Sequence, residues 1–317
     1  MSRSPRQEIA DSLTVGAYRV GALLSPGVPT ALSATVGTLL GGPASVAMRE
    51  RRTMVERHMR RVVPEANRLE IRRLTQRVFD SYARYYVESF RLPSLSARQV
   101  ASSFEVEGYE EHLVTALDRG NGAILALPHL GGWEWAGRWA ADLGNKMTVV
   151  VEPLDPPELF EWFVSLREKF GMRVIPVGPD AGAAALAALR ANEVLCLLCD
   201  RDITGGGVAT RFFGERTLLP AGPATLALRT GAALLPTAVY FSDRRDGHLG
   251  VIRPPLDCHR EGRLRSDVER ITQILAGELE DLIERAPEQW HLLQPNWPSD
   301  PGYPHRVPGD APPSNDR

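Results

Sequence analysis

The chain has few cysteines and no arrangement of them that suits a disulfide framework. Three cysteines among 317 residues are an odd number, and they fit a reducing compartment better than a secreted, disulfide-rich domain. Cys196 and Cys199 form a CxxC, but they lie in the apolar run EVLCLLCD, which is typical of a buried strand with the two side chains on opposite faces. Since no second Cys or His pair stands at zinc spacing, we interpret both as structural residues and expect no metal.

The sequence also lacks the common nucleotide-binding and hydrolase motifs. It contains no P-loop, no GxSxG nucleophile elbow, no HExxH helix and no repeat of fixed period. The three glycines at 205–207 are outside the strand-turn-helix context that a GxGxxG motif requires, so dinucleotide binding is disfavoured. No cofactor is therefore expected.

The amino-terminal part lacks an uninterrupted hydrophobic run of membrane-spanning length. The start MSRSPRQEIADS has no long apolar region and no small-residue cleavage site after its basic residues, so no secretory signal is expected. Residues 20–48 carry no charge over 29 residues, but Pro26, Pro29, Pro43 and five glycines interrupt them. We interpret this stretch as two short hydrophobic segments that lie along or dip into an interface. The alternative is that both are ordinary core helices.

Positive charge is concentrated in the first third of a chain whose formal net charge is only −2. Residues 1–98 contain 16 Arg against eight acidic residues, and residues 49–98 alone contain 13 Arg against six. Apolar residues at helical spacing, with Pro64 as a break, predict a helical hairpin in this stretch. Its charge would be attracted to an anionic membrane or to nucleic acid. The same pattern also describes a solvated face with internal ion pairs.

From Gly122 onward, strand-like and helix-like segments alternate. Strands are expected in GAILALPH, MTVVVEPL, RVIPVG, VLCLLCDRD, ALLPTAVYFS and HLGVIRPPLDC, with helical patterns between and after them. Repeated crossovers of this length predict an α/β fold with a largely parallel central sheet flanked by helices. We predict three parts: a helical, Arg-rich, membrane-docking region at 1–105, an α/β core at 106–298, and a polar, Pro-rich, disordered tail at 299–317.

The stretch ALPHLGGWEWAG has the most informative pattern, because a strand is expected to end at His129. On one continuous helix His129 and Glu134 would lie ~140° apart, so they need the turn that Gly131 and Gly132 can supply. Glu134 would then lie in the first turn of the next helix and hold one ring nitrogen of the imidazole. The other nitrogen could take the proton of an attacking hydroxyl, at the sheet edge where ligands of α/β folds bind. A strand-end histidine that is merely hydrogen-bonded is the alternative.

The motif HLGGWE resembles the HxxxxD/E motif of the lysophospholipid acyltransferase superfamily. The order of the segments is similar to that of its lipid A lauroyl/myristoyl acyltransferase branch, with the likeness running from about Gln7 to Trp297. It includes DRD at 200–202, FFGE at 212–215, PAGPATLALRTGAALLP and PEQWHLLQPNWP, in that order. Within the branch, the chain is most similar to the phosphatidylinositol mannoside acyltransferases.

The resemblance implies a reaction and a place in the cell. The acyl donor would be acyl-CoA, a co-substrate rather than a cofactor, and the acceptor a hydroxyl of a glycophospholipid, a mannose hydroxyl in the phosphatidylinositol mannosides. The enzyme would be peripheral, bound to the anionic surface at the cytoplasmic face of the cell membrane, with no nucleic-acid partner.

The resemblance also implies roles for single residues. His129 would be the general base and Glu134 its orienting partner, in place of the Asp that is usual in much of the superfamily. Arg167 matches the second-block arginine of the family and would hold a phosphate of the donor or acceptor. Several aromatic residues could line an acyl groove or simply belong to the core. These are Trp133, Trp135, Trp139, Trp162 and Phe163.

The DRD motif supplies further candidates. Asp200 or Asp202 would complete the constellation around the histidine, and the register of the strand decides which of them points inward. A salt bridge with Arg201 or a cap on the following glycine turn is the structural alternative for these carboxylates. Arg201, Arg211 and Arg229 are candidates for contacts with the substrates.

Three other functions remain compatible with the sequence. A lipid A-type acyltransferase would use acyl carrier protein, although relatives of that type usually carry a clean amino-terminal anchor helix, which Pro26 and Pro29 break here. A non-catalytic membrane or nucleic-acid binding protein would depend on the Arg-rich hairpin instead of His129. A thioesterase would result if the acceptor pocket admitted water.

Overall fold

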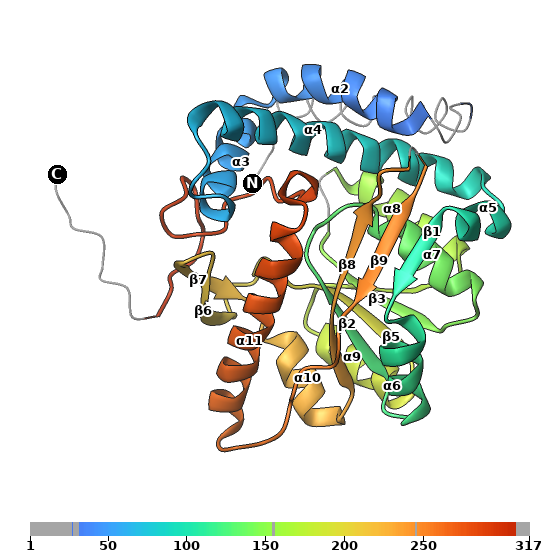
Figure 1. Cartoon of the computed structure of the whole chain (residues 1–317). Coiled ribbons are helices and arrows are strands. Elements are labelled where there is room, and N and C mark those ends of the chain that lie inside the picture. Colours follow the sequence, from blue (N-terminus) through green and yellow to red (C-terminus); the bar gives the residue numbers. More distant parts are fainter. Residues whose placement is uncertain (1–26, 28–31, 154–155, 245, 309–317) are drawn as a thin grey trace.

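A computed structural model describes residues 27, 32–153, 156–244 and 246–308 of the chain. It has a mixed α/β architecture in which helices cover both faces of a central sheet, and two long helices lie across the ends of its strands (Figure 1). The strand order is β1-β9-β8-β2-β5-β3-β4. All neighbouring strands run parallel except β8 and β9. The largely parallel sheet predicted from the alternating segments is confirmed.

The strands of the central sheet are short and mostly buried. They are β1 (Phe104–Glu107), β2 (Ala123–Leu127), β3 (Met147–Val151), β4 (Arg173–Pro176), β5 (Val194–Leu198), β8 (Ala233–Phe241) and β9 (His248–Ile252). In β2 all five residues are buried. A strand covered on both faces needs apolar side chains at every position, which explains the uninterrupted run AILAL.

Helices cover the sheet on its two faces. The helices of the core are α5 (Ala97–Ser102), α6 (Thr115–Asp118), α7 (Trp133–Asp142), α8 (Pro157–Lys169), α9 (Ala181–Arg190), α10 (Gly222–Thr230) and α11 (Leu264–Glu284). Ile124 and Ala126 of β2 pack into one apolar cluster with α9, α10 and α11, whereas Leu125 and Leu127 pack into another with α7. The alternation of β2 therefore builds two cores, one on each face.

Strand β1 and a small hairpin were not predicted from the sequence. Strands β6 (Val208–Phe212) and β7 (Glu215–Leu219) form a separate antiparallel hairpin. Its turn contains Phe213, which has a positive φ of 46°. The hairpin packs on α11 and next to the carboxyl-terminal segment, where Phe212 and Trp297 stack.

The amino-terminal region is helical, as predicted. It contains α2 (Ser33–Ala47), α3 (Arg49–Val62) and α4 (Arg68–Arg91), and the α3–α4 hairpin breaks at the predicted Pro64. Helix α4 begins with a capping box between Asn67 and Glu70. Figure 1 shows α2 and α4 side by side across the strand ends. A Cβ atom at Gly37 would lie 2.8 Å from Cβ of Arg84, so only glycine permits this close approach.

The predicted hydrophobic segments fall partly outside the described residues. The second forms α2, and its side chains Leu39, Leu40 and Val46 are exposed. The first lies outside the described residues except for Gly27. Within the described part of the chain, no helix combines the length and the apolarity needed to cross a membrane.

The predicted boundary of a disordered tail at residue 299 needs correction. Residues 299–308 are part of the described structure, Asp300 and Val307 are buried, and Asp300 bonds to side chains of α3. A buried carboxylate with several donors anchors the segment, which the Pro-rich composition conceals. Only residues 309–317 of the predicted tail lie outside the described residues.

Candidate active site

His129 and Asp200 form a hydrogen-bonded pair at the carboxyl edge of the sheet. Leu127 at the end of β2 is in register with Leu198 at the end of β5, and each member of the pair lies two residues farther on. The ring Nδ1 of His129 lies 2.6 Å from Oδ1 of Asp200, and the backbone N–H of His129 donates to Oδ2 at 3.0 Å. Parallel register thus brings together residues 71 positions apart.

The environment of Asp200 keeps it ionised. Its side chain is fully buried, and the indole Nε1–H of Trp290 donates to Oδ2 at 2.7 Å. Burial raises the pKa of the Asp200 carboxyl, but the charge of His129 and the bonds from His129 and Trp290 outweigh it, so the pKa is lowered. Because a carboxylate only accepts, Nδ1 of His129 carries a proton, and in the neutral ring Nε2 keeps its lone pair. The His129 side chain is 25% exposed, which leaves room for a reactant.

The structure corrects the role expected for Glu134. This residue does lie in the first turn of α7, after a turn in which Gly131 has a positive φ of 60°. However, its carboxylate faces α4 and α8, where it accepts from the Tyr85 hydroxyl at 3.1 Å and from Arg167 Nε at 3.2 Å. Arg167 Nη2 makes a second, shorter contact. Asp200 takes the place at the imidazole that the sequence pattern assigned to Glu134.

Arg167 belongs to the same buried cluster, together with Glu134 and Tyr85. Burial lowers the pKa of its guanidinium, but the adjacent Glu134 carboxylate outweighs this effect and raises it above the ordinary value. The phosphate contact that the sequence suggested for Arg167 is replaced in this structure by a bidentate pair with Glu134. Tyr85 packs against Trp133 with the two rings tilted by 30° and their centroids 4.2 Å apart, and it closes the cluster.

The second acidic residue of DRD has a structural position. Asp202 Oδ2 accepts from the backbone N–H of Gly205 at 2.6 Å, and Oδ1 accepts from the Thr204 hydroxyl at 3.2 Å. Asp202 therefore caps the glycine turn, which is the structural alternative given above for this carboxylate. Arg201 pairs with Glu152 just after β3, near the same edge of the sheet as Asp200.

The other two arginine candidates are not brought to His129. Arg211 is exposed on β6, where its Nη1 donates to the carbonyl of Gly214 at 3.0 Å. Arg229 is exposed in the last turn of α10, which ends at Thr230, shortly before β8 begins at Ala233. Since β8 runs parallel to β2, this turn lies at the amino edge of the sheet, opposite to His129.

The sequence pattern missed the contribution of residues 289–300. Leu130 and Trp290 form an isolated antiparallel bridge, and the backbone N–H of His291 donates to the His129 carbonyl at 2.7 Å. Asn296 Nδ2 donates to the Asp200 carbonyl at 2.9 Å. The motif PEQWHLLQPNWP thus supports both members of the pair. The feature of the sequence that could have identified this segment is its indole, imidazole and amide side chains, which lie close together in the chain.

His291 is a second histidine beside His129 and stays neutral. Burial and the nearby His129 lower its pKa to about 3. Its Nε2 lies 2.8 Å from the Ser81 hydroxyl on α4. His291 therefore stays unprotonated near neutral pH.

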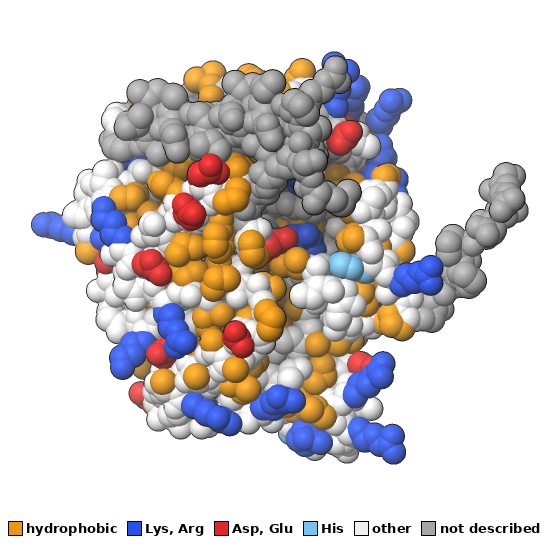
Figure 2. All heavy atoms as spheres, turned by 180° about the vertical axis from the view of Figure 1, so that it is seen from behind, with side chains coloured by type: hydrophobic (Ala, Val, Ile, Leu, Met, Phe, Trp, Pro, Cys, Tyr) orange, Lys and Arg blue, Asp and Glu red, His pale blue; other side chains and the backbone are white. Residues whose placement is uncertain are grey.

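An apolar cavity of about 100 Å³ lies between α7 and the sheet. Its lining includes Leu125, Val149, Met172, Val239 and Ile252 from five parts of the fold. Trp133 also lines it and packs edge-on against the His129 ring, with centroids 5.9 Å apart. Figure 2 shows hydrophobic side chains gathered near the middle of the back face of the molecule. The cavity therefore reaches the residue that adjoins the catalytic candidate.

The charged and sulfur-containing groups of the cavity are unreactive. Glu134 and Arg167, the charged residues of its lining, pair with each other. Cys196 also lines it, and burial raises the pKa of its thiol to about 12. Cys199 packs in the core on the other face, so the predicted opposite orientation of the two cysteines is confirmed. Among the described residues, no group of three or more His, Cys, Asp or Glu could hold a metal ion.

Comparison with known proteins identifies the family. Residues 2–299 match the family of bacterial lipid A biosynthesis acyltransferases. A phosphatidylinositol mannoside acyltransferase of Mycobacterium tuberculosis is 43% identical over 225 residues, which cover 70% of this chain and 69% of the relative. One of Mycolicibacterium smegmatis is 37% identical over 303 residues, covering 95% of this chain and 96% of the relative. The protein is therefore an acyltransferase that belongs to the bacterial lipid A biosynthesis acyltransferase family.

Proposed function

We propose that this enzyme transfers a fatty acyl group from acyl-CoA to a mannose hydroxyl of a phosphatidylinositol mannoside. The two relatives are named phosphatidylinositol mannoside acyltransferases, which supports the choice of acceptor. The observation that carries the mechanism is the 2.6 Å contact between His129 Nδ1 and Asp200 Oδ1, which leaves Nε2 as the base. The adjoining apolar cavity suits a fatty chain.

His129 acts as a general base and then as a general acid. The acceptor hydroxyl gives its proton to Nε2 while its oxygen forms a bond to the thioester carbonyl carbon. When the tetrahedral intermediate collapses, the carbon–sulfur bond breaks and the leaving thiolate of CoA takes the proton back from Nε2. Asp200 stabilises the imidazolium between the two steps. The acyl group moves directly to the acceptor, without a covalent enzyme intermediate.

The apolar cavity between α7 and the sheet holds the acyl chain in this proposal. Each buried methylene contributes ~0.8 kcal/mol to binding, so a long chain supplies much of the affinity for the donor. The pairing of Glu134 with Arg167 neutralises the charges of the lining, which suits an apolar occupant. Glu134 serves the reaction by building this wall instead of by holding His129.

The amino-terminal helices attach the enzyme to the cytoplasmic face of the membrane in this proposal. Leu39 and Val46 on α2 are 69% and 65% exposed, and α3 carries several exposed arginines next to them along the chain. Apolar side chains beside basic ones suit the surface of an anionic bilayer. Other arginines of the hairpin are internally paired, for example Arg61 with Glu215 and Arg77 with Glu288, and do not contribute to this attraction.

Thiol release from palmitoyl-CoA tests the proposed reaction. The assay compares the wild type with His129→Ala, with and without a mannosylated phosphatidylinositol acceptor. We expect release that depends on the acceptor and falls by at least ~10²-fold in the variant. Release that ignores the acceptor would instead indicate a thioesterase, and preference for an acyl carrier protein donor would indicate a lipid A-type enzyme. Equal activity of the variant would remove His129 from the mechanism.

A further inference from the structure

Trp290 bonds to one oxygen of the Asp200 carboxylate, and the His129 ring contacts the other. Its indole Nε1 lies 2.7 Å from Asp200 Oδ2, and both side chains are almost fully buried. An indole N–H only donates, so this is a charge-assisted hydrogen bond to the carboxylate. Trp290 is 90 residues from Asp200 in the sequence and reaches it from the carboxyl-terminal segment.

The bonds to the Asp200 carboxylate fix its rotation. Oδ2 accepts from Trp290 and from the backbone N–H of His129, whereas Oδ1 faces the imidazole Nδ1. Without the indole, Oδ2 keeps only the backbone bond at 3.0 Å, and the charge of the carboxylate is less dispersed. Both changes act on His129 through Asp200.

We propose that Trp290 is a positioning residue for the His129–Asp200 pair, which holds the carboxylate in place and tunes how tightly His129 keeps its proton. The proposal rests on the general-base role of His129 set out above. The Trp290 side chain takes no part in the chemistry itself, because its indole N–H bonds to the Asp200 carboxylate and not to the His129 ring.

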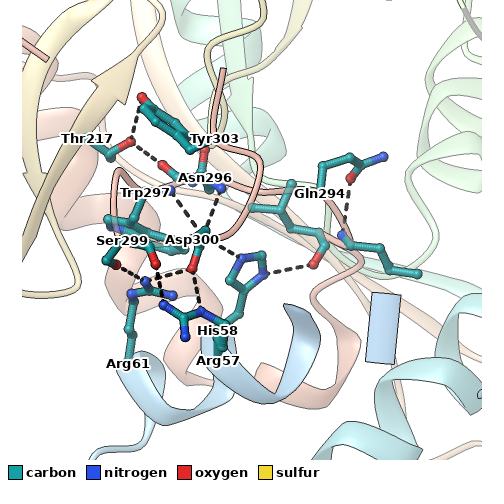
Figure 3. Close-up of polar contacts among 12 residues, drawn as sticks. Arg57, His58, Arg61, Thr217, Gln294, Asn296, Trp297, Ser299, Asp300 and Tyr303 are labelled. Carbon is teal, nitrogen blue, oxygen red and sulfur yellow. Dashed lines mark hydrogen bonds and ion pairs between the residues drawn. The ribbon is translucent and has the colours of Figure 1, made fainter. Parts of the chain in front are cut away.

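Asp300 anchors the carboxyl-terminal segment that carries Trp290. Figure 3 shows Asp300 between α3 and the chain at Asn296 and Trp297. Its Oδ2 accepts from the backbone N–H groups of Asn296 and Trp297, at 3.0 and 3.1 Å. Its Oδ1 accepts from Arg57 at 3.0 Å and from Arg61 at 2.8 Å. These bonds fix the segment on α3 and thereby fix Trp290 over Asp200.

Removal of the Trp290 indole donor should make His129 hold its proton more tightly. Asp200 then attracts the proton on His129 more strongly, because a larger share of its negative charge lies on the oxygen that faces the ring. The free base forms only at higher pH, and the acidic limb of the rate profile moves upward. Among the described residues, Asp200 and His291 are titratable groups that interact with His129, and His291 is neutral because its pKa is lowered to about 3.

Trp297 provides a matched control. It is fully buried like Trp290, and its indole Nε1 donates to a carbonyl, that of Phe212, at 3.0 Å. Trp297→Phe therefore removes a similar area and one indole hydrogen bond without touching Asp200. A purely structural role of Trp290 would make the two Phe variants behave alike.

The test is an NMR titration of the His129 ring in wild type, Trp290→Phe and Trp297→Phe, with the signal assigned through His129→Asn. We expect the midpoint to rise by about one pH unit in Trp290→Phe and to stay unchanged in Trp297→Phe. Incorporation of benzothienylalanine at position 290 keeps the shape of the ring system, removes only the donor, and should reproduce the shift if the Phe variant does not fold. Equal midpoints in wild type and in the benzothienylalanine protein would overturn the proposal.

The same proteins are then assayed for acyl transfer across pH. We expect the acidic limb of the profile to follow the NMR midpoint in each protein. If the wild type transfers no acyl group to the mannosylated acceptor, the proposed function fails, whereas the titration of His129 still decides the role of Trp290.

Discussion

His129 and Asp200 meet because β2 and β5 are paired in register up to their last residues, Leu127 and Leu198. Each residue then extends two positions beyond its strand, and the ring and the carboxylate come within 2.6 Å. A slip of one residue in β5 would turn Asp200 to the other face, and a slip in β2 would turn His129. The geometry of the pair therefore depends on the sheet as a whole.

The buried pair of Glu134 and Arg167 should behave as a coupled unit in unfolding. Arg167→Met leaves the Glu134 carboxylate buried without its counter-charge, so we expect a loss of ~3–5 kcal/mol in the free energy of unfolding. The double variant Glu134→Gln/Arg167→Met removes both charges and should lose less than the sum of the single variants. Urea denaturation measures all three. Strict additivity would show that the two side chains do not interact.

Gly137 on α7 should set how much acyl chain the cavity accepts. It lines the cavity, and a Cβ atom there would lie 3.1 Å from Cε of Met172, so a larger side chain fills space that the chain would occupy. In Gly137→Val, the loss of room for two methylenes should lower kcat/KM for palmitoyl-CoA by roughly 10-fold relative to a shorter acyl-CoA. Gly182→Val in α9, where a Cβ would meet nothing within 4 Å, is the control for helix propensity. An unchanged chain-length preference in Gly137→Val would place the acyl chain elsewhere.

His291 should make the enzyme labile to acid. Its pKa is lowered to about 3 in the folded protein, against ~6.5 in an unfolded chain. The unfolded state therefore binds more protons between these values, and stability that is complete above pH ~6.5 is lost as the pH falls toward 3. Urea unfolding at pH 7.5 and 4.5 should show a larger acid loss in wild type than in His291→Gln. Equal losses of stability would mean that the folded protein binds a proton at His291 as readily as the unfolded chain does.

The exposed apolar face of α2 should bind anionic vesicles. Leu39→Glu combined with Val46→Glu replaces apolar contacts by charges that an anionic surface repels, so we expect at least ~10-fold weaker binding in a flotation assay. Leu143→Glu changes another exposed leucine, at the end of α7, and should have little effect. Binding of the wild type should weaken with added salt. Unaltered flotation of the α2 double variant would exclude this face.

The sequence predicted the architecture well because local patterns carry it. The apolar run of β2, the alternation of strands and helices and the break at Pro64 all depend on residues close together in the chain, and each has its counterpart in the structure. The β6–β7 hairpin was missed because the motif FFGE hides its turn, in which Phe213 takes a positive φ.

The candidate site was predicted only in part, because its partners are distant in sequence. The spacing of His129 and Glu134 suggested a pair, yet the turn at Gly131 directs Glu134 toward Tyr85 and Arg167 instead. Asp200 and Asp202 could not be told apart without the register of β5. The anchoring of the chain near Asp300 by two arginines of α3 could not be read from a Pro-rich tail.

We predict that Asp200, and not Glu134, orients His129, the proposed general base. The most direct test of this prediction is the kcat for acyl transfer by Asp200→Asn and Glu134→Gln at saturating palmitoyl-CoA, measured on folded protein. We predict a fall of ~10³–10⁴-fold for Asp200→Asn, since the amide cannot stabilise the imidazolium, and a fall of less than ~10-fold for Glu134→Gln, whose effect is on the cavity wall. Near-normal kcat in Asp200→Asn together with an inactive Glu134→Gln would contradict the account.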